Sequence, residues 1–287
     1  MQLKQLKTLG AAVALTLTFT SATIAETQST QPTATQQTQS AAPVNMSQVS
    51  YIMGYGLGKL LAEEKLTVDY KAFNSGYSAG KIHKPDQAQA TNKSYVIGYK
   101  IAGKFESDNV NIQLDRFTTG MKDSIAKKPS AISTKDAENA MQAFLHEKTL
   151  QYNAAVKANQ KTSAEYLAKV EKQSGVKQLD KGLYYKVITA GKGEIPTATD
   201  TVTVNYEGSL PNGKVFDSSY NRGKPASFQV NKVIPGWTKA LEKMPVGSTW
   251  ELYISPELAY GTYAPSIIGP NQALTFKVSL IDIKKSA

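Results

Sequence analysis

Aromatic residues and a carboxylate lie close together in the stretch 201–220. Tyr206 belongs to an alternating apolar pattern that predicts a β-strand, and Phe216 begins a second predicted strand. Because the Asn212-Gly213 pair between them is a strong hairpin signal, we expect both rings to face one interior. Asp217 would then lie at the edge of an aromatic pocket, where an isolated charge is costly without a partner. This pattern predicts a binding site.

Three further segments would position such a site. Pro235 predicts the first turn of a short helix, and Trp237 lies on its apolar face, so this ring would point inward. Residues 250–254 predict a strand that ends shortly before Tyr260, and residues 273–283 predict a closing strand with alternating apolar residues. The order of these segments predicts a small antiparallel sheet packed on a short helix.

The composition excludes several kinds of catalysis from this region. The chain has no Cys, and its two histidines, His83 and His146, both lie well before the stretch described above. A Cys or His nucleophile, a His general base and a Cys/His zinc site are therefore excluded there. We expect no metal and no cofactor.

Taken together, residues 182–287 resemble the FKBP-type peptidyl-prolyl cis-trans isomerases, because the motifs of that family occur in order and at sensible spacing. The resemblance implies a twisted antiparallel β-sheet wrapped on a short helix. It also implies catalysis without a covalent step, since prolyl isomerisation only rotates an amide bond. By motif position, the catalytic residues would be Asp217, Tyr260 and Ile234, and the substrate-binding residues would be Tyr206, Phe216, Val233, Trp237, Ile268 and Phe276.

The resemblance also assigns roles to these groups. A dry aromatic pocket favours the twisted amide, which is less polar than the planar one, and so binds the transition state better than the ground state. The Tyr260 hydroxyl and the Ile234 N–H would hold the substrate carbonyls, with Trp237 as the floor under the proline ring. Two departures, Ala226 in place of a Phe and a shorter loop at 262–270, would affect the rim and therefore substrate preference.

Each of these residues also has a purely structural interpretation. Aromatic residues at alternating strand positions are usually core, Asp217 could pair with Arg222, and Tyr260 could bond to the backbone. Their joint occurrence in motif order favours a functional pocket.

The resemblance implies a folding catalyst and chaperone for extracytoplasmic clients. Its partners would be proline-containing polypeptides, and it would bind macrolides of the rapamycin type. Two other classes of function stay open, namely a holdase chaperone with a vestigial pocket and a surface interaction protein. Turnover of a short Xaa-Pro peptide separates the isomerase from both.

The first 25 residues predict a secretory signal peptide (1–25). Lys4 and Lys7 precede an apolar run at 9–19, and small residues follow the run. The run is too short for a transmembrane helix, so we expect no stable membrane insertion and a periplasmic protein, or one at the outer surface or secreted. Residues 26–45, rich in Thr, Gln and Ser, predict a disordered leader.

The chain carries a formal net charge of +10 at pH 7. Its basic residues are scattered among acidic ones and do not form a cluster interleaved with aromatic residues. We therefore expect a solvated basic surface and no nucleic-acid partner.

An internal repeat occupies the predicted helical module at 46–132. The sequence SYIMGY at 50–55 recurs as SYVIGY at 94–99, an offset of 44 residues. Each copy predicts two short helices, and the first helix of the first copy carries Gly54 and Gly58 one turn apart. Since each glycine costs about 1 kcal/mol relative to Ala in a helix, a close approach by another helix is the expected reason.

A long helix at 133–175 should follow, with a capping box at Ser133 and Gly175 as its stop, before an isomerase domain at 176–287. The predicted fold class is therefore α+β. This arrangement resembles the extracytoplasmic branch of the family that is similar to the macrophage infectivity potentiator. In that branch the helical module is present once per chain, and two chains intertwine their copies. Because this chain carries two copies, they could pair within one chain and give a monomer, or both could pair with a second chain and give a homodimer.

Overall fold

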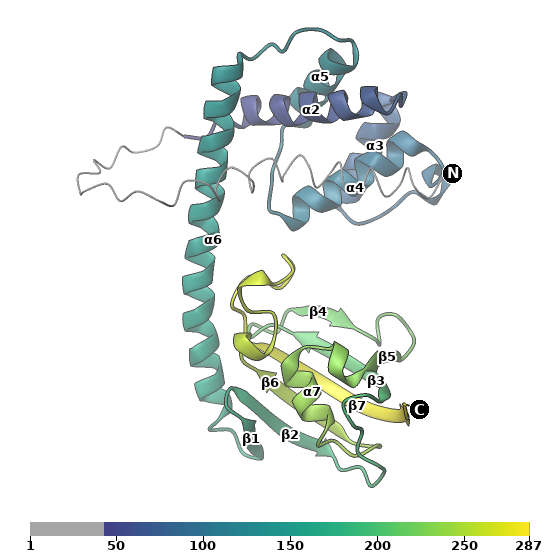
Figure 1. The fold of residues 1–287 in the computed structure, drawn as a ribbon, viewed down its shortest axis with the longest axis vertical. Coiled ribbons are helices and arrows are strands. Elements are labelled where there is room, and N and C mark those ends of the chain that lie inside the picture. The colour runs from purple at the N-terminus through teal and green to yellow at the C-terminus, as the bar shows by residue number, and fades with distance from the viewer. Residues whose placement is uncertain (1–42, 287) are drawn as a thin grey trace, which may run out of the picture. The chain divides into compact units, whose positions relative to one another are not determined.

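A computed structural model describes residues 43–286 of the chain (Figure 1). The predicted signal peptide and most of the predicted leader lie outside the described residues. The chain divides into two compact units within its long helix, between Thr149 and Leu150. We describe the two units separately, as the helical unit (43–149) and the unit that contains the predicted isomerase domain, which we call the isomerase unit (150–286).

The helical unit contains two helices from each copy of the repeat and the first part of the long helix. Asn45 caps the first helix, since its side chain accepts hydrogen bonds from two backbone N–H groups, and Asn92 caps the third in the same way. The elements are α2 (Met46–Glu63), α3 (Tyr70–Lys81), η1 (Gln87–Gln89), α4 (Lys93–Ser107), α5 (Leu114–Ile125) and the beginning of α6 (Thr134–Val170).

The two copies of the repeat pair crosswise, with α2 packed on α5 and α3 packed on α4. A Cβ atom built at Gly54 would lie closer than 3.0 Å to the Phe117 carbonyl oxygen, and one built at Gly98 would lie equally close to the Phe73 carbonyl oxygen. The missing side chains therefore let the helix backbones touch. Gly76 on α3 and Gly120 on α5 make the reciprocal contacts with Tyr95 and Tyr51, so the first helix of each copy packs on the second helix of the other.

This pairing follows the internal symmetry of the sequence. The Phe73 and Phe117 rings, which are equivalent in the two copies, stack with centroids 6.2 Å apart and an angle of 9° between their planes. Ser50 Oγ accepts a hydrogen bond from the Gln113 N–H at 2.9 Å, and the equivalent Ser94 Oγ accepts one from the Asp69 N–H at 3.0 Å. Each copy thus completes the core of the other.

The long helix α6 contributes to both units. It begins after Ser133, whose hydroxyl accepts a hydrogen bond from the Asp136 N–H at 3.1 Å, as the capping box predicts. Ala140 and Phe144 near its beginning are buried in the core of the helical unit. The helix ends at Val170, before the predicted end, because the chain then turns into the first strand.

The isomerase unit is built on one antiparallel sheet with the strand order β1-β2-β6-β7-β3-β4, and β5 also pairs with β3. The short helix α7 packs against the sheet through its buried residues. This architecture confirms the predicted α+β fold class (Figure 1). The elements are β1 (Val176–Asp180), β2 (Leu183–Thr189), β3 (Thr201–Ser209), β4 (Val215–Ser218), β5 (Ala226–Gln229), η2 (Val230–Lys232), α7 (Pro235–Leu241), β6 (Thr249–Ile254), η3 (Pro256–Leu258), η4 (Gly261–Tyr263) and β7 (Leu274–Lys284).

The core of this unit follows the alternation in the sequence. On β3 every second residue is buried, on β7 alternate residues are buried from Leu274 to Leu280, and Pro235 is the first residue of α7, as predicted. The β3–β4 hairpin turns at Gly213, which has a positive φ of 82° that suits glycine. Between residues 43 and 286, no helix is long and apolar enough to cross a membrane.

Candidate functional site

Trp237 is held in the core of the isomerase unit by the start of α7. Its exposed fraction is only 4%. The residue before it, Gly236, allows α7 to approach β6 closely, since a Cβ atom there would lie within 3.0 Å of the Ile254 side chain. The position of this ring therefore depends on a glycine contact as well as on burial.

Three aromatic rings meet Trp237 edge to face. The ring centroids lie 5.3 Å away for Tyr206, 5.2 Å for Phe276 and 5.9 Å for Phe228, with interplanar angles of 84–88°. Phe216 in turn contacts Phe276 at 5.6 Å and 90°. This geometry suits the quadrupoles of the rings. The structure thus brings together four of the predicted substrate-binding residues, and we call these five rings the aromatic cluster.

Phe228 was missing from the predicted site. It lies on β5, where Ala226 and Phe228 are half-buried and alternate with exposed Ser227 and Gln229. Alternation of apolar and polar residues is the sequence signal that could have identified Phe228. The signal is weak because β5 is short and begins with Ala226, where the chain departs from the family pattern. The aromatic cluster therefore includes a ring contributed by β5.

Aliphatic residues complete the surroundings of the cluster. Ile268 is buried in the same core, with an exposed fraction of 5%, and Val233 and Ile234 pack against it while partly exposed. Ile234 is the residue before α7, and its carbonyl accepts hydrogen bonds from the Trp237 and Thr238 N–H groups. Its own N–H donates to no group within residues 43–286. This leaves a backbone donor beside the cluster without a protein partner.

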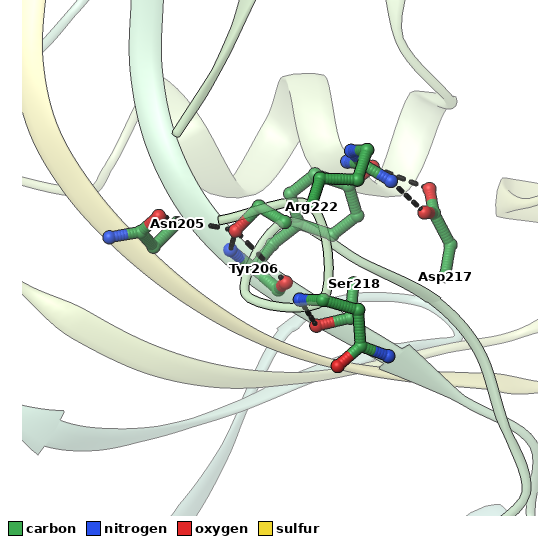
Figure 2. Close-up of polar contacts among 7 residues, drawn as sticks. Asn205, Tyr206, Asp217, Ser218 and Arg222 are labelled. Atoms are coloured by element: carbon green, nitrogen blue, oxygen red, sulfur yellow. Dashed lines mark hydrogen bonds and ion pairs between the residues drawn. The ribbon is translucent and has the colours of Figure 1, made fainter. Parts of the chain in front are cut away.

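Asp217 is part of a three-residue polar network with Tyr206 and Arg222 (Figure 2). The Tyr206 hydroxyl donates to the Asp217 carboxylate at 2.5 Å and accepts from Arg222 Nη2 at 2.7 Å. Arg222 also pairs directly with Asp217. Asp217 therefore has a structural role, because Arg222 compensates its charge and its carboxylate fixes the Tyr206 ring.

The network also sets the protonation states of its members. Burial by itself would raise the pKa of Asp217, but hydrogen bonds from Tyr206 and Arg222 outweigh burial and lower that pKa. Burial and the bond to Asp217 raise the pKa of Tyr206. At neutral pH the carboxylate is therefore charged and the phenol is neutral.

Tyr260 lies at the edge of this region, between η3 and η4, with an exposed fraction of 40%. Burial and the negative charge of Asp217 raise the pKa of the Tyr260 hydroxyl, so it keeps its proton. Its hydroxyl has no hydrogen-bond partner among the residues that the structure describes. Tyr260 is therefore not held by a bond to the backbone, and its O–H is free to donate.

Trp237 carries a third donor, which is buried. Its Nε1 atom is shielded from solvent and has no partner within the described part of the chain. A buried donor left unpaired costs about 1–3 kcal/mol, and such groups in native structures call for an explanation. The cluster thus contains one buried donor, Trp237 Nε1, and has two partly exposed donors beside it, the Ile234 N–H and the Tyr260 hydroxyl.

Comparison with known proteins shows which family this chain resembles. The family model described as "FKBP-type peptidyl-prolyl cis-trans isomerase" matches residues 192–281. The peptidyl-prolyl cis-trans isomerase Mip of Coxiella burnetii (strain RSA 493 / Nine Mile phase I) is 40% identical over 206 residues, which cover 70% of this chain and 90% of that protein. The chain belongs to the FKBP-type peptidyl-prolyl cis-trans isomerases. The prediction of an isomerase is confirmed, and the non-enzymatic alternatives are not favoured.

Other relatives of this FKBP-type isomerase agree. The outer membrane protein MIP of Legionella longbeachae is 38% identical, with 68% of this chain and 85% of that protein covered. The crystal structure of FkpA from Escherichia coli superposes with a TM-score of 0.51 at 37% identity, and the match covers 71% of this chain and 99% of that chain.

The first copy of the repeat extends beyond the family models. The model described as the "domain amino terminal to FKBP-type peptidyl-prolyl isomerase" matches residues 90–187, which contain α4, α5 and α6. The first copy, with α2 and α3, precedes that match. The second copy therefore lies inside the region that this family model matches, and the first copy lies outside it.

Proposed function

We propose that this isomerase binds the proline ring of its substrate on the aromatic cluster around Trp237. The observation that carries this proposal is the pair of unpaired donors, the Ile234 N–H and the Tyr260 hydroxyl, beside the apolar rings that surround Trp237. Apolar rings match a pyrrolidine ring, and unpaired donors match the carbonyls on either side of it. Val233, Ile268, Phe216 and Phe276 would complete the apolar surface.

In this mechanism the protein lowers a rotational barrier. The barrier to isomerisation is about 20 kcal/mol, because rotation removes amide resonance. The Tyr260 hydroxyl and the Ile234 N–H hold the substrate carbonyls, and the aromatic surface favours the less polar twisted amide. Asp217 acts by holding Tyr206 through their hydrogen bond.

A protease-free isomerisation assay on a short Xaa-Pro peptide tests this proposal. We expect turnover by the wild type and its loss on addition of rapamycin, which we propose binds the same aromatic cluster. Turnover that rapamycin leaves unchanged would contradict the assignment of the site but not the activity. A complete lack of turnover would contradict the proposed function itself.

We also propose that the protein is a monomer, because its duplicated module pairs within the chain. The support is the crosswise packing of α2 on α5 and α3 on α4, which satisfies both copies. The linker between the copies keeps them at high effective concentration, in the millimolar range for short flexible linkers. A homodimer through the helical module is the alternative.

Light scattering on the mature protein at micromolar concentration decides between them. A mass near that of one chain agrees with intrachain pairing. A two-chain mass that persists on dilution contradicts it.

We further propose that the isomerase acts outside the cytoplasm as a folding catalyst and chaperone. The signal-peptide pattern supports export, and one relative is called an outer membrane protein. Fractionation and amino-terminal sequencing test this, with cleavage after Ala25 and recovery from the periplasm as the expected result. The proposed divisions are a signal peptide at 1–25, a leader at 26–45, the duplicated module at 46–132, a connecting helix at 133–175 and the isomerase domain at 176–287.

The chaperone activity would reside in the isomerase unit. Within residues 43–149, Ile82 is the large hydrophobic residue with a strongly exposed side chain, at 64%. The helical unit therefore offers little apolar surface to an unfolded client. If residues 26–174 alone suppressed aggregation as well as the whole chain, this assignment would be wrong.

A further inference from the structure

An open groove of about 760 Å³ lies in the isomerase unit between the second half of α6 and the segment that follows Tyr260. None of the side chains that line it is charged. The groove therefore suits an apolar or aromatic group better than an ion. Its lining residues are Tyr152, Asn153, Val156, Thr262, Tyr263 and Ala264.

The segment 261–273, which we call the rim loop, is fastened to α6 near both of its ends. The Asn271 N–H donates to the Gly261 carbonyl at 2.8 Å, which closes the loop. Ser163 has an exposed fraction of only 2%, and its hydroxyl donates to the Asn271 carbonyl and accepts from the Ala273 N–H. Two other α6 side chains also donate to the rim loop, namely the Tyr152 hydroxyl to Thr262 O at 2.7 Å and Asn159 Nδ2 to Pro270 O at 2.8 Å.

These bonds come from one face of α6. Positions 152, 159 and 163 are separated by seven and four residues, the spacing at which side chains share a helix face. A loop whose carbonyls are held by a helix is ordered before any ligand arrives. Binding to it therefore costs little conformational entropy.

Tyr263 is the most exposed aromatic residue of the rim loop. With an exposed fraction of 95%, it is the most exposed of the large hydrophobic residues between positions 43 and 286. An aromatic ring on a fixed backbone offers large contact area at low entropic cost, because only two side-chain angles need to be fixed. Such a ring is well suited to bind a partner.

The rim loop links the groove to the candidate active site along the chain. Tyr263 follows Tyr260 by one turn of η4, a rise of about 6 Å in a 3₁₀-helix. An extended polypeptide spans that distance with about two residues. The rim loop also carries Ile268, one of the predicted substrate-binding residues, so both sites share one structural element.

We propose that this groove binds an apolar or aromatic side chain of the client polypeptide, about two residues away from the isomerised proline. The inference rests on the proposed function, since it extends the site assigned there. The occupant is an unfolded segment, because a peptide held at Tyr260 reaches the groove beside Tyr263 within about two extended residues.

Matched peptides test this proposal. Octapeptides with a central Xaa-Pro bond would carry Leu or Ser at the second position on one side of that bond, in separate amino- and carboxyl-terminal versions. We expect the wild type to bind one Leu version about five-fold more tightly than its Ser partner, because an open groove covers only part of the side chain. Fluorescence anisotropy gives the affinities, and the protease-free assay gives kcat/KM.

Tyr263→Ala should remove this preference and leave turnover of a tetrapeptide unchanged, whereas Tyr263→Phe should retain it. Ile188→Ser is the matched control, because Ile188 is a similarly apolar residue with 48% exposure that does not line the groove. The control should keep the full preference.

A second pair of variants tests the role of α6. Ser163→Ala removes the bonds to the rim loop, so hydrogen exchange should rise in residues 261–273 and the preference for Leu should fall. Thr162→Ala is its control, since the Thr162 hydroxyl donates only to the Ala158 carbonyl within the helix, at 2.9 Å. It should change neither measurement.

The outcomes separate the two proposals. Equal affinities for the Leu and Ser peptides in the wild type, or a preference that survives Tyr263→Ala, would overturn the groove as a client site. Failure to turn over any peptide would contradict the isomerase site instead, and the anisotropy measurement would still decide on the groove.

Discussion

The helical unit and the isomerase unit both contain residues that cost stability, but they compensate for that cost differently. In the helical unit, Gly54 and Gly98 weaken their own helices, and close backbone contact with Phe117 and Phe73 provides the compensation. In the isomerase unit, the donor of Trp237 is buried without a partner inside the protein. The helical unit also buries two unpaired polar atoms, Asn74 Oδ1 and Arg116 Nε, so an unpaired atom alone does not distinguish the units. Close backbone contact at glycine indicates packing in the helical unit, whereas donors at the edge of an aromatic cluster indicate the candidate site in the isomerase unit.

The largest expected effect comes from disrupting the glycine contact in the helical unit. Gly54→Leu should unfold the helical unit, because even a Cβ atom at this position would lie closer than 3.0 Å to backbone atoms of Phe117. We expect a destabilisation of about 3 kcal/mol or more, since a backbone cannot move aside as a side chain can. Thermal unfolding followed by circular dichroism measures it.

Gly56→Ala is the matched control for Gly54, one half-turn away in the same helix. A Cβ atom at Gly56 would meet nothing within 4 Å. Alanine there should stabilise the helix by up to about 1 kcal/mol. Activity on short peptides should be unchanged in both variants, and its loss in a folded Gly54→Leu protein would mean that the two units communicate.

Asp217→Ala tests the polar network of the isomerase unit. It leaves the Tyr206 hydroxyl and Arg222 without their shared acceptor, so kcat/KM should fall by about 10- to 100-fold, equivalent to about 1–3 kcal/mol. The stability loss should be nearer 1 kcal/mol, because the carboxylate is partly exposed and water can replace it. Wild-type kcat/KM in this variant would remove Asp217 from the mechanism.

Tyr260→Phe should separate function from stability more cleanly. Because the hydroxyl bonds to no residue in the range 43–286, its removal should leave the unfolding midpoint unchanged. The loss of one positioned contact to the substrate should lower kcat/KM by about ten-fold. A drop in stability with unchanged activity would reverse the roles proposed for Tyr260 and Asp217.

The smallest expected effect is the response to pH. The pKa of Asp217 is lowered and those of Tyr206 and Tyr260 are raised, so none of these groups titrates near neutrality, and the isomerase unit contains no His. We expect a flat profile of kcat/KM between pH 6 and 8. An inflection in that range, present with substrates that do not titrate, would contradict the assignment.

The lowered pKa of Asp217 also predicts how the stability of the fold changes at acidic pH. Because the pKa of Asp217 is lower in the folded state than in the unfolded chain, its pairing stabilises the fold fully above about pH 5. That contribution is lost as the pH falls through the folded pKa. Asp217→Asn should therefore unfold with a weaker dependence on pH between about 5 and 2 than the wild type.

Much of the isomerase unit could be predicted because its signals are local. Alternation in β3 and β7, the Asn212-Gly213 turn and Pro235 at the start of α7 each follow from a few neighbouring residues. Phe228 was missed, since a four-residue strand carries little periodicity. The unpaired state of the Trp237 and Ile234 donors was also beyond the sequence, because it depends on every group that comes near them in space.

The sequence by itself determined the repeat, the family motifs and the positions where a helix needs a close neighbour. It could not say which helix that neighbour would be, because the glycines of α2 show only that some backbone must approach. The tertiary structure decided that α2 packs on α5 of the other copy. It also decided that α6 fastens the rim loop, because Ser163 and Asn271 are more than a hundred residues apart, and only folding brings them within hydrogen-bond distance.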